Sequence, residues 1–111
     1  MPHDAEKHLW DMLDACRYLT EYTQDKTVEE YKADRAVRSV IERQYLIIGE
    51  ALIRLDREYP DWAGRISQFK DIIGFRHVLA HRYDAIEAEL VWKAIEKLPI
   101  LIAELEKLLP D

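Results

Sequence analysis

Apolar residues recur every three or four positions along most of the chain, a spacing typical of amphipathic helices. One such stretch covers residues 4–22, and a second runs over 27–59 without a proline. A third is expected over 67–81, and a last helix begins near residue 87. Pro99 lies inside this last stretch, where it should kink the helix or split it in two. The pattern predicts an all-α fold, a four- to five-helix up-and-down bundle.

The junctions between these helices carry their own signals. Thr27 and Glu30 match the capping box that starts a helix, so the second helix should begin there. Asp34 is the expected place for a bend in it. Pro60 should end this helix, and the DWAGRIS segment at 61–67 is expected to form a short connection.

The composition restricts the class of protein. With 111 residues, 49% of them hydrophobic and 34% charged, the chain has room for one domain with a modest core, residues 1–111. Its apolar runs are too short to cross a bilayer, and no signal-peptide pattern stands at its beginning. Cys16 is the only cysteine, which excludes an internal disulfide and argues against a cysteine-based metal site. We therefore expect a cytoplasmic protein without a membrane partner.

The net charge of −6 argues against a protein that coats nucleic acid, because such proteins have a basic surface overall. The charge is unevenly distributed, however. Between Arg65 and Tyr83 there are four basic side chains and one acidic side chain, a local charge of +3. A basic island in an acidic protein is what a localised phosphate-binding site needs, although chance clustering also produces such islands.

Two adjacent residues are unusual for the middle of the second helix. Gly49 costs a helix roughly 1 kcal/mol relative to alanine, and such a glycine is usually tolerated because another helix packs closely against it. Glu50 follows it in the most apolar turn. A glutamate there either faces solvent, which is the commoner case, or is buried with a cationic partner, for which Arg76 is one candidate.

The segment GFRHVLAHRYD, residues 74–84, concentrates the chemically active side chains of the chain. Arg76 shares a helical face with Leu79 and Tyr83, so it interrupts an apolar stripe. A purely structural arrangement would bury its aliphatic stem while the guanidinium reaches water or Glu50. The alternative is that the segment forms an active site.

A metal site is a poor match to this segment. His77 and His81 are four residues apart, a spacing that can hold a metal ion on a helix. The metalloprotease pattern H-E-x-x-H needs a glutamate after the first histidine, and Val78 occupies that position. A third ligand is also missing, because His3 and His8 lie far away in the sequence. We expect neither a metal nor a cofactor.

Metal-free cleavage of a phosphodiester is the remaining chemistry. A histidine can move a proton near neutral pH, and an arginine can stabilise the negative charge that develops on the phosphoryl group. Arg76 and His81 are turned roughly 140° apart on an ideal helix, so one copy makes a poor pocket. A two-fold homodimer that faces helix to helix would bring two copies of each into one cleft.

These residues resemble a known family. Arg76, His81 and Tyr83 fit R-x4-H-x-Y, the signature of the HepT-like branch of the HEPN superfamily. The segments IIGEAL at 47–52 and ELVWKAIEKLPIL at 89–101 are similar to the second and last helices of that branch. The resemblance therefore covers nearly the whole chain, in the same order.

The resemblance implies a helical, homodimeric endoribonuclease that is the toxin of a toxin–antitoxin pair and cleaves RNA such as tRNA or mRNA. It implies that Arg76 and His81 are the catalytic pair. It also implies attack by the ribose 2′-hydroxyl, which gives a cyclic phosphate without a metal. The usual partner is a minimal nucleotidyltransferase antitoxin, and Tyr83 matches the tyrosine that this partner can modify with AMP to block the RNA cleft.

One position departs from the family pattern, and two other interpretations stay open. Many relatives carry Asn directly after the arginine, whereas this chain has His77, which would add a second proton carrier or alter substrate contacts. The domain could instead be a non-catalytic HEPN-like module that binds a nucleotide or a protein in the same cleft. It could also be a structural bundle with an Arg76–Glu50 ion pair, which leaves His81 and Tyr83 unexplained.

Overall fold

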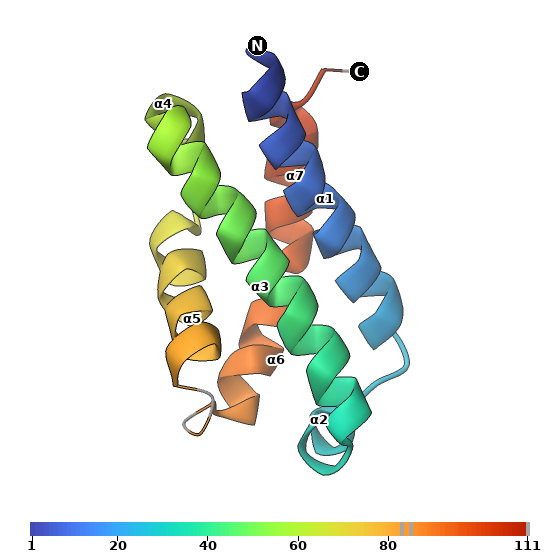
Figure 1. Ribbon diagram of the computed structural model, residues 1–111. Coiled ribbons are helices and arrows are strands. Elements are labelled where there is room, and N and C mark those ends of the chain that lie inside the picture. Colours follow the sequence, from blue (N-terminus) through green and yellow to red (C-terminus); the bar gives the residue numbers. More distant parts are fainter. Residues whose placement is uncertain (83, 85, 111) are drawn as a thin grey trace.

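The computed structural model describes residues 1–82, 84 and 86–110, and Figure 1 shows its helices lying roughly alongside one another. Seven α-helices occur in this part of the chain: α1 (His3–Thr23), α2 (Val28–Ala33), α3 (Arg35–Glu58), α4 (Pro60–Ala63), α5 (Phe69–His81), α6 (Ala88–Glu96) and α7 (Leu98–Leu108). The described residues contain no strand, which confirms the predicted all-α fold.

The long helices α1 and α3 pack against each other and form the centre of the bundle. The helix α5 lies against α3, and α7 lies against α1, behind it in Figure 1. The short helix α2 connects α1 to α3 at the lower end of Figure 1, where it also contacts α6. The predicted bundle is therefore correct, with two short helices added between its main elements.

Side-chain caps explain where α2 and α3 begin. The hydroxyl of Thr27 accepts a hydrogen bond of 3.1 Å from the backbone N–H of Glu30, as the predicted capping box requires. Asp34 ends α2 in an extended conformation, and its carboxylate accepts a 2.9 Å hydrogen bond from the backbone N–H of Ala36. The bend expected at Asp34 is thus a complete break between α2 and α3.

Two of the four prolines, Pro60 and Pro99, stand in the first turn of a helix. Pro60 ends α3 as predicted, but it also opens the four-residue helix α4, so the expectation of a plain connection over 61–67 is wrong. A proline is well suited to the first turn of a helix because the N–H that it lacks would be unpaired there. Pro99 stands in the first turn of α7 and produces the predicted break, with Lys97 between α6 and α7.

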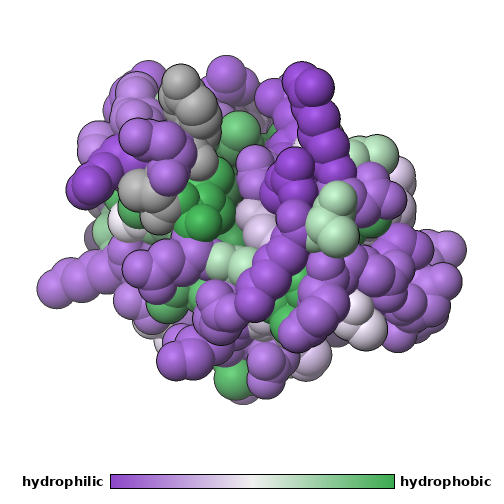
Figure 2. Space-filling model, turned by 90° about the horizontal axis from the view of Figure 1, so that it is seen from below, coloured by the Kyte–Doolittle hydropathy of each residue, from purple (hydrophilic) through white to green (hydrophobic). Residues whose placement is uncertain are grey.

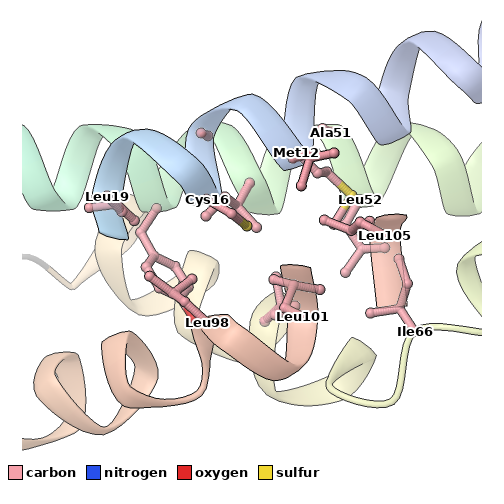
Figure 3. Close-up of a cluster of buried hydrophobic side chains, with 14 of the residues drawn as sticks. Met12, Cys16, Leu19, Ala51, Leu52, Ile66, Leu98, Leu101 and Leu105 are labelled. Carbon is pink, nitrogen blue, oxygen red and sulfur yellow. The ribbon is translucent and has the colours of Figure 1, made fainter. Parts of the chain in front are cut away.

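The core is formed mainly by aliphatic side chains of α1, α3 and α7. Figure 3 shows that side chains from these helices meet in one cluster, together with Ile66 from the segment before α5; the members labelled from the helices are Met12, Cys16, Leu19, Ala51, Leu52, Leu98, Leu101 and Leu105. Burial of this apolar surface is the main force that holds α1, α3 and α7 together. The face of α3 that points away from the core remains available for other contacts.

Candidate active site

The helix α5 carries the chemically active segment and is fixed to α3 by apolar packing. Ile72 and Leu79 are buried on its inner face. The rings of Phe75 and Tyr45 meet edge to face, with centroids 4.9 Å apart, which joins α5 to α3 at the residue directly before Arg76. These contacts fix the position of α5, and with it the backbone positions of the residues on its exposed surface.

Gly49 allows α5 to lie unusually close to α3. A Cβ atom at position 49 would lie 2.5 Å from both Cβ and Cγ of Arg76, which is closer than real Cβ atoms come to a neighbour. Only a glycine therefore permits the stem of Arg76 to cross the surface of α3 at this point. The expectation that a second helix packs closely on Gly49 is confirmed.

The guanidinium of Arg76 binds the carboxylate of Glu50. Its Nε donates a 2.8 Å hydrogen bond to Oε1 of Glu50, and its Nη2 donates to the same oxygen. The side chains of Arg76 and Glu50 are 23% and 43% exposed, so the pair lies at the surface rather than in the core. Glu50 thus combines the two expected alternatives, because it is paired with Arg76 and also open to solvent.

The two histidines of α5 point away from this pair. The imidazole rings of His77 and His81 lie one turn apart on an exposed face, with centroids 4.9 Å apart. His81 is the last residue of α5. Within the described structure Arg76 bonds to Glu50 and the rings of His77 and His81 lie side by side, and no hydrogen bond or ion pair joins the two pairs. Tyr83, the predicted modification site, lies outside the described residues.

A hollow of about 550 Å³ lies on the outer face of α3, between α1 and α5, and we call it the α3 groove. Its charged and small lining residues are Asp11 and Asp14 of α1, Arg43, Glu50 and Arg54 of α3, and Ala80 of α5. Leu46 and Ile47 are its half-buried apolar part. The Arg76–Glu50 pair therefore borders a groove that also contains two further arginines.

Sequence reasoning missed Arg43 and Arg54 as members of the candidate site. The signal was present, since Arg43, Ile47, Glu50 and Arg54 follow one another at intervals of four, three and four and share one helical face. The periodicity alone does not say which face of α3 stays uncovered by other helices, and that information came from the packing of α1 and α5.

His8 lies at the end of the α3 groove and is buried. Its Nε2 atom is 3.4 Å from Oε1 of Glu58, close enough for an ion pair when the imidazole is charged. The geometry does not meet that of a hydrogen bond, and Nε2 has no hydrogen-bond partner in the described structure. We regard His8 and Glu58 as close neighbours rather than as a formed hydrogen bond.

The lower end of the molecule, where α5 ends and α3 begins, is the face that Figure 2 shows. It is mostly hydrophilic, with smaller apolar areas between the polar side chains. Within the described residues no three His, Cys, Asp or Glu side chains gather closely enough to hold a metal ion. The described helices also include none with the length and apolar character needed to cross a membrane.

Comparison with known proteins identifies the family. A family model described as "Ribonuclease HepT-like" matches residues 12–108 of the chain. The chain belongs to the HepT-like ribonuclease family. This HepT-like chain is 28% identical over 104 residues to "Putative RNase MJ1380" of Methanocaldococcus jannaschii, a match that covers 93% of the chain and 94% of that relative.

Two further relatives of this HepT-like protein come from other organisms. It is 30% identical over 100 residues to "Putative RNase TTE0752" of Caldanaerobacter subterraneus, covering 90% of the chain and 86% of that protein. It is 25% identical over 109 residues to "Probable ribonuclease HepT" of Thermococcus cleftensis, covering 97% and 98% respectively. No solved structure gives a significant match. The family and its ribonuclease character agree with the resemblance of the R-x4-H-x-Y segment.

Proposed function

We propose that this HepT-like protein is a metal-independent endoribonuclease in which Arg76 and His81 carry out the cleavage. The observation that supports this most is the position of Arg76. Its guanidinium is held by Glu50 at the surface, beside a groove, on the same helix as the exposed His81. The relatives named as RNases support ribonuclease activity.

The proposed reaction begins when the 2′-hydroxyl of a ribose attacks the adjacent phosphorus. His81 accepts the proton of that hydroxyl as the new O–P bond forms. The bond from phosphorus to the 5′-oxygen of the next nucleotide breaks, and that oxygen takes up a proton, from the second copy's His81 or from water. The products are a 2′,3′-cyclic phosphate and a free 5′-hydroxyl, with no oxidation or reduction.

Arg76 would stabilise the negative charge that builds up on the phosphoryl oxygens in the transition state. A guanidinium has five N–H groups, and the two bonds to Glu50 use two of them. Within the described residues three N–H groups are therefore left for a phosphate. Glu50 would act as a positioning residue, because it holds the guanidinium in one orientation before the substrate arrives.

The proposed enzyme is a two-fold homodimer. Arg76 faces α3 while His81 lies on the exposed face of α5, so one chain alone does not bring the two groups together. The uncovered surface of α3 at the α3 groove carries half-buried Leu46 and Ile47, which a second copy would bury. Sedimentation velocity of the purified chain tests this arrangement, and a monomer at the concentration of the cleavage assay would contradict it.

We further propose that the protein is the toxin of a toxin–antitoxin pair, with a minimal nucleotidyltransferase as its antitoxin. Tyr83 follows His81 by two residues, so an AMP group on its hydroxyl would bring a phosphate and a nucleoside close to the proposed cleft. Incubation with ATP and a minimal nucleotidyltransferase should add the mass of one AMP group to the wild type. Tyr83→Phe should gain none, and equal modification of both chains would exclude Tyr83 as the site.

The cleavage itself is tested with purified protein, labelled tRNA and mRNA, and EDTA. Wild type is expected to cut RNA into fragments with cyclic phosphate ends, and His81→Ala is expected to lose this activity. His77→Ala removes the neighbouring histidine and should lower the rate less than His81→Ala does. A dimeric, unmodified wild type that leaves every RNA intact would contradict the proposal.

A non-catalytic binding module is the second candidate, and the Arg76–Glu50 ion pair favours it to some extent. Such a pair satisfies the arginine without any chemistry, as a structural role would require. This candidate predicts that RNA or a nucleotide binds in the cleft and dissociates without being cleaved. Recovery of intact RNA after long incubation with wild type would therefore bring this function to the front.

A further inference from the structure

A second groove lies on the opposite flank of α5, between α5 and α6, and we call it the α5–α6 groove. Its volume is about 400 Å³, and the lining residues that matter most are Lys70, Gly74 and Val78 of α5, with Leu90, Lys93 and Lys97 of α6 and its C-terminal cap. The amide of Gln68 donates a 3.2 Å hydrogen bond to the carbonyl of Lys97, which joins the two sides at one end. The proposed active site does not use this groove.

The groove is basic although the protein is acidic. It is lined by Lys70, Lys93 and Lys97 and by one acidic residue, Asp71, a local charge of +2 in a chain whose net charge is −6. All three lysines are exposed. Among the described residues no carboxylate lies within ion-pair distance of any of them. Unpaired lysines around one groove raise the local concentration of a polyanion.

A hollow beside α2 and the start of α3 is also basic, but it differs in this respect. It is lined by Lys32 and Arg38, among others, and both side chains already have partners. Lys32 pairs with Glu89 at 2.8 Å, and Arg38 donates a 2.7 Å hydrogen bond to the carbonyl of Lys32. Of the cations in that hollow only Arg35 lacks a partner among the described residues, whereas in the α5–α6 groove all three lysines lack one.

Gly74 gives an independent sign that something lies close to α5 here. Inside a helix, glycine lowers stability more than any other residue except proline, so its presence needs an explanation. The backbone supplies none, because no described glycine has a positive φ. Packing supplies none either, since a Cβ at position 74 would meet nothing within 4 Å. A ligand that approaches the helix backbone would explain the missing side chain.

The floor of the groove is apolar and partly aromatic. Phe75 and Val78 are half-buried in it, and Leu90 is 51% exposed at its edge. A nucleobase is flat and apolar on its faces, and bases stack on such side chains in proteins that bind single strands. Lysines at the rim together with an apolar floor are therefore complementary to the two parts of a single-stranded nucleic acid.

The groove is continuous with the face of α5 that carries His81. Lys70, Gly74, His77 and His81 follow one another at intervals of four, three and four, which places them along one helical stripe. The stripe from Lys70 to His81 is about 16 Å long at the rise of an α-helix. A strand whose phosphate lies at His81 can therefore continue along α5 to the lysines without leaving the surface.

We propose that the α5–α6 groove holds the single-stranded RNA next to the scissile phosphate, with Lys70, Lys93 and Lys97 binding its phosphates and Gly74 letting the strand lie against α5. This proposal rests on the proposed ribonuclease function, and it assigns the part of the protein that binds the rest of the substrate. The continuity with His81 and the apolar floor favour RNA over an acidic protein as the occupant.

The experiment measures binding of the full chain to a fluorescein-labelled single-stranded RNA made of 2′-O-methyl nucleotides, which has no 2′-hydroxyl to attack. The dissociation constant is followed by fluorescence polarisation as the KCl concentration is raised. Each phosphate contact to a single strand contributes about 0.7 to the slope of log affinity against log salt. The double variant Lys93→Ala/Lys97→Ala should therefore lose about 1.4 from the slope.

Between 50 and 200 mM KCl, wild type should weaken about sevenfold more than this double variant. Lys107→Ala is the matched control, because it removes an exposed lysine near the end of α7 and should leave the slope unchanged. Asp71→Asn removes the acidic residue of the groove and should tighten binding. Gly74→Ala should fold normally, because its Cβ has space, yet bind RNA more weakly.

The outcomes separate this inference from the proposed function. If wild type cleaves ordinary RNA while the lysine variants bind with its affinity and slope, the inference is wrong and the ribonuclease stands. If wild type neither binds nor cleaves RNA, the proposed function fails, and the inference fails with it. If the lysine variants keep RNA binding but lose dimer formation or binding to an acidic protein, the groove is a protein interface and the inference is overturned.

Discussion

Gly49 and Arg76 lie in direct contact where α3 and α5 cross, so close that a Cβ on residue 49 would be 2.5 Å from the Arg76 side chain. This contact brings the guanidinium to Glu50, the residue directly after the glycine. The position of the proposed catalytic arginine therefore depends on a residue that has no chemistry of its own. A glycine inside the most apolar turn of a helix is here part of the site's architecture.

Gly49→Ala should destabilise the protein although alanine is the better helix former. Overpacking typically costs about 1–3 kcal/mol, which outweighs the gain of up to about 1 kcal/mol in helix propensity. Gly74→Ala is the matched control, since its Cβ meets open space, and it should raise the melting temperature. Thermal unfolding followed by circular dichroism measures both, and shifts of the same sign would contradict the contact between α3 and α5.

Glu50→Ala should slow cleavage without weakening RNA binding, because the carboxylate positions Arg76 and does not touch the substrate. A misplacement of about 1 Å can cost up to about a hundredfold in rate. Glu50→Gln keeps a hydrogen-bond acceptor and should recover most of the rate. Single-turnover kinetics separate the two effects, and a change in the dissociation constant alone would disprove a positioning role.

A suitable control for this change is Glu106→Ala. Glu106 also pairs with an arginine, Arg17, at 2.9 Å, but both residues lie outside the proposed site. Loss of that exposed ion pair should cost at most about 1 kcal/mol and leave the cleavage rate as it is. If Glu50→Ala and Glu106→Ala lower the cleavage rate equally, the loss of stability alone explains the effect of Glu50→Ala.

Arg76→Ala should fold and unfold almost normally while losing cleavage. A partly exposed ion pair contributes about 1 kcal/mol or less, so the melting temperature should fall by only a few degrees, about 4–8 °C for each kcal/mol. The rate should fall by about a hundredfold or more if the guanidinium stabilises the transition state. Arg76→Lys keeps the charge but not the planar fork, and should restore little. A large loss of stability with cleavage retained would assign Arg76 a structural role.

The thiol of Cys16 should be unreactive in the native protein. Burial raises its pKa from 9.0 to about 12, so the thiolate that reacts with disulfide reagents is scarce at pH 8. Because the folded pKa lies above the unfolded one, the associated stability is complete below pH 9 and is lost as the pH rises towards 12. Reaction with a chromogenic disulfide should be slow in buffer and fast in urea, and a rapid native reaction would show that α1 is not packed as described.

The helices themselves could largely be predicted from the sequence, because apolar spacing and caps such as Thr27 act locally. The division of the last helix shows the limit of this approach. In α7 the residues Leu98, Leu101 and Leu105 are buried, whereas Ile102, which the three- and four-residue spacing also places near this face, is only half-buried. A proline marks where a helix is interrupted, whereas the rotation of the next helix depends on the packing of α7 against α1.

The candidate site could be predicted only where its residues are close in sequence or are of a type that is unusual for their surroundings. Arg76 and His81 stand in one segment, and Gly49 and Glu50 are out of character in an apolar helix. Of the lysines of the α5–α6 groove, Lys70 belongs to the basic island between Arg65 and Tyr83, but Lys93 and Lys97 gave no such signal. Lys93 is one of many charged residues on a surface helix, and its significance appears only when α6 is placed beside α5.

The most direct test of the central claim uses one defined RNA and the same RNA with a single 2′-deoxynucleotide at the mapped cleavage position. Both are incubated with wild type in EDTA, and the ends are identified by mass spectrometry. The account predicts that the RNA is cut to a 2′,3′-cyclic phosphate and a 5′-hydroxyl, while the deoxy substrate stays intact at that position. Cleavage of both substrates at the same position, or of neither, would contradict a metal-free ribonuclease that works through the 2′-hydroxyl.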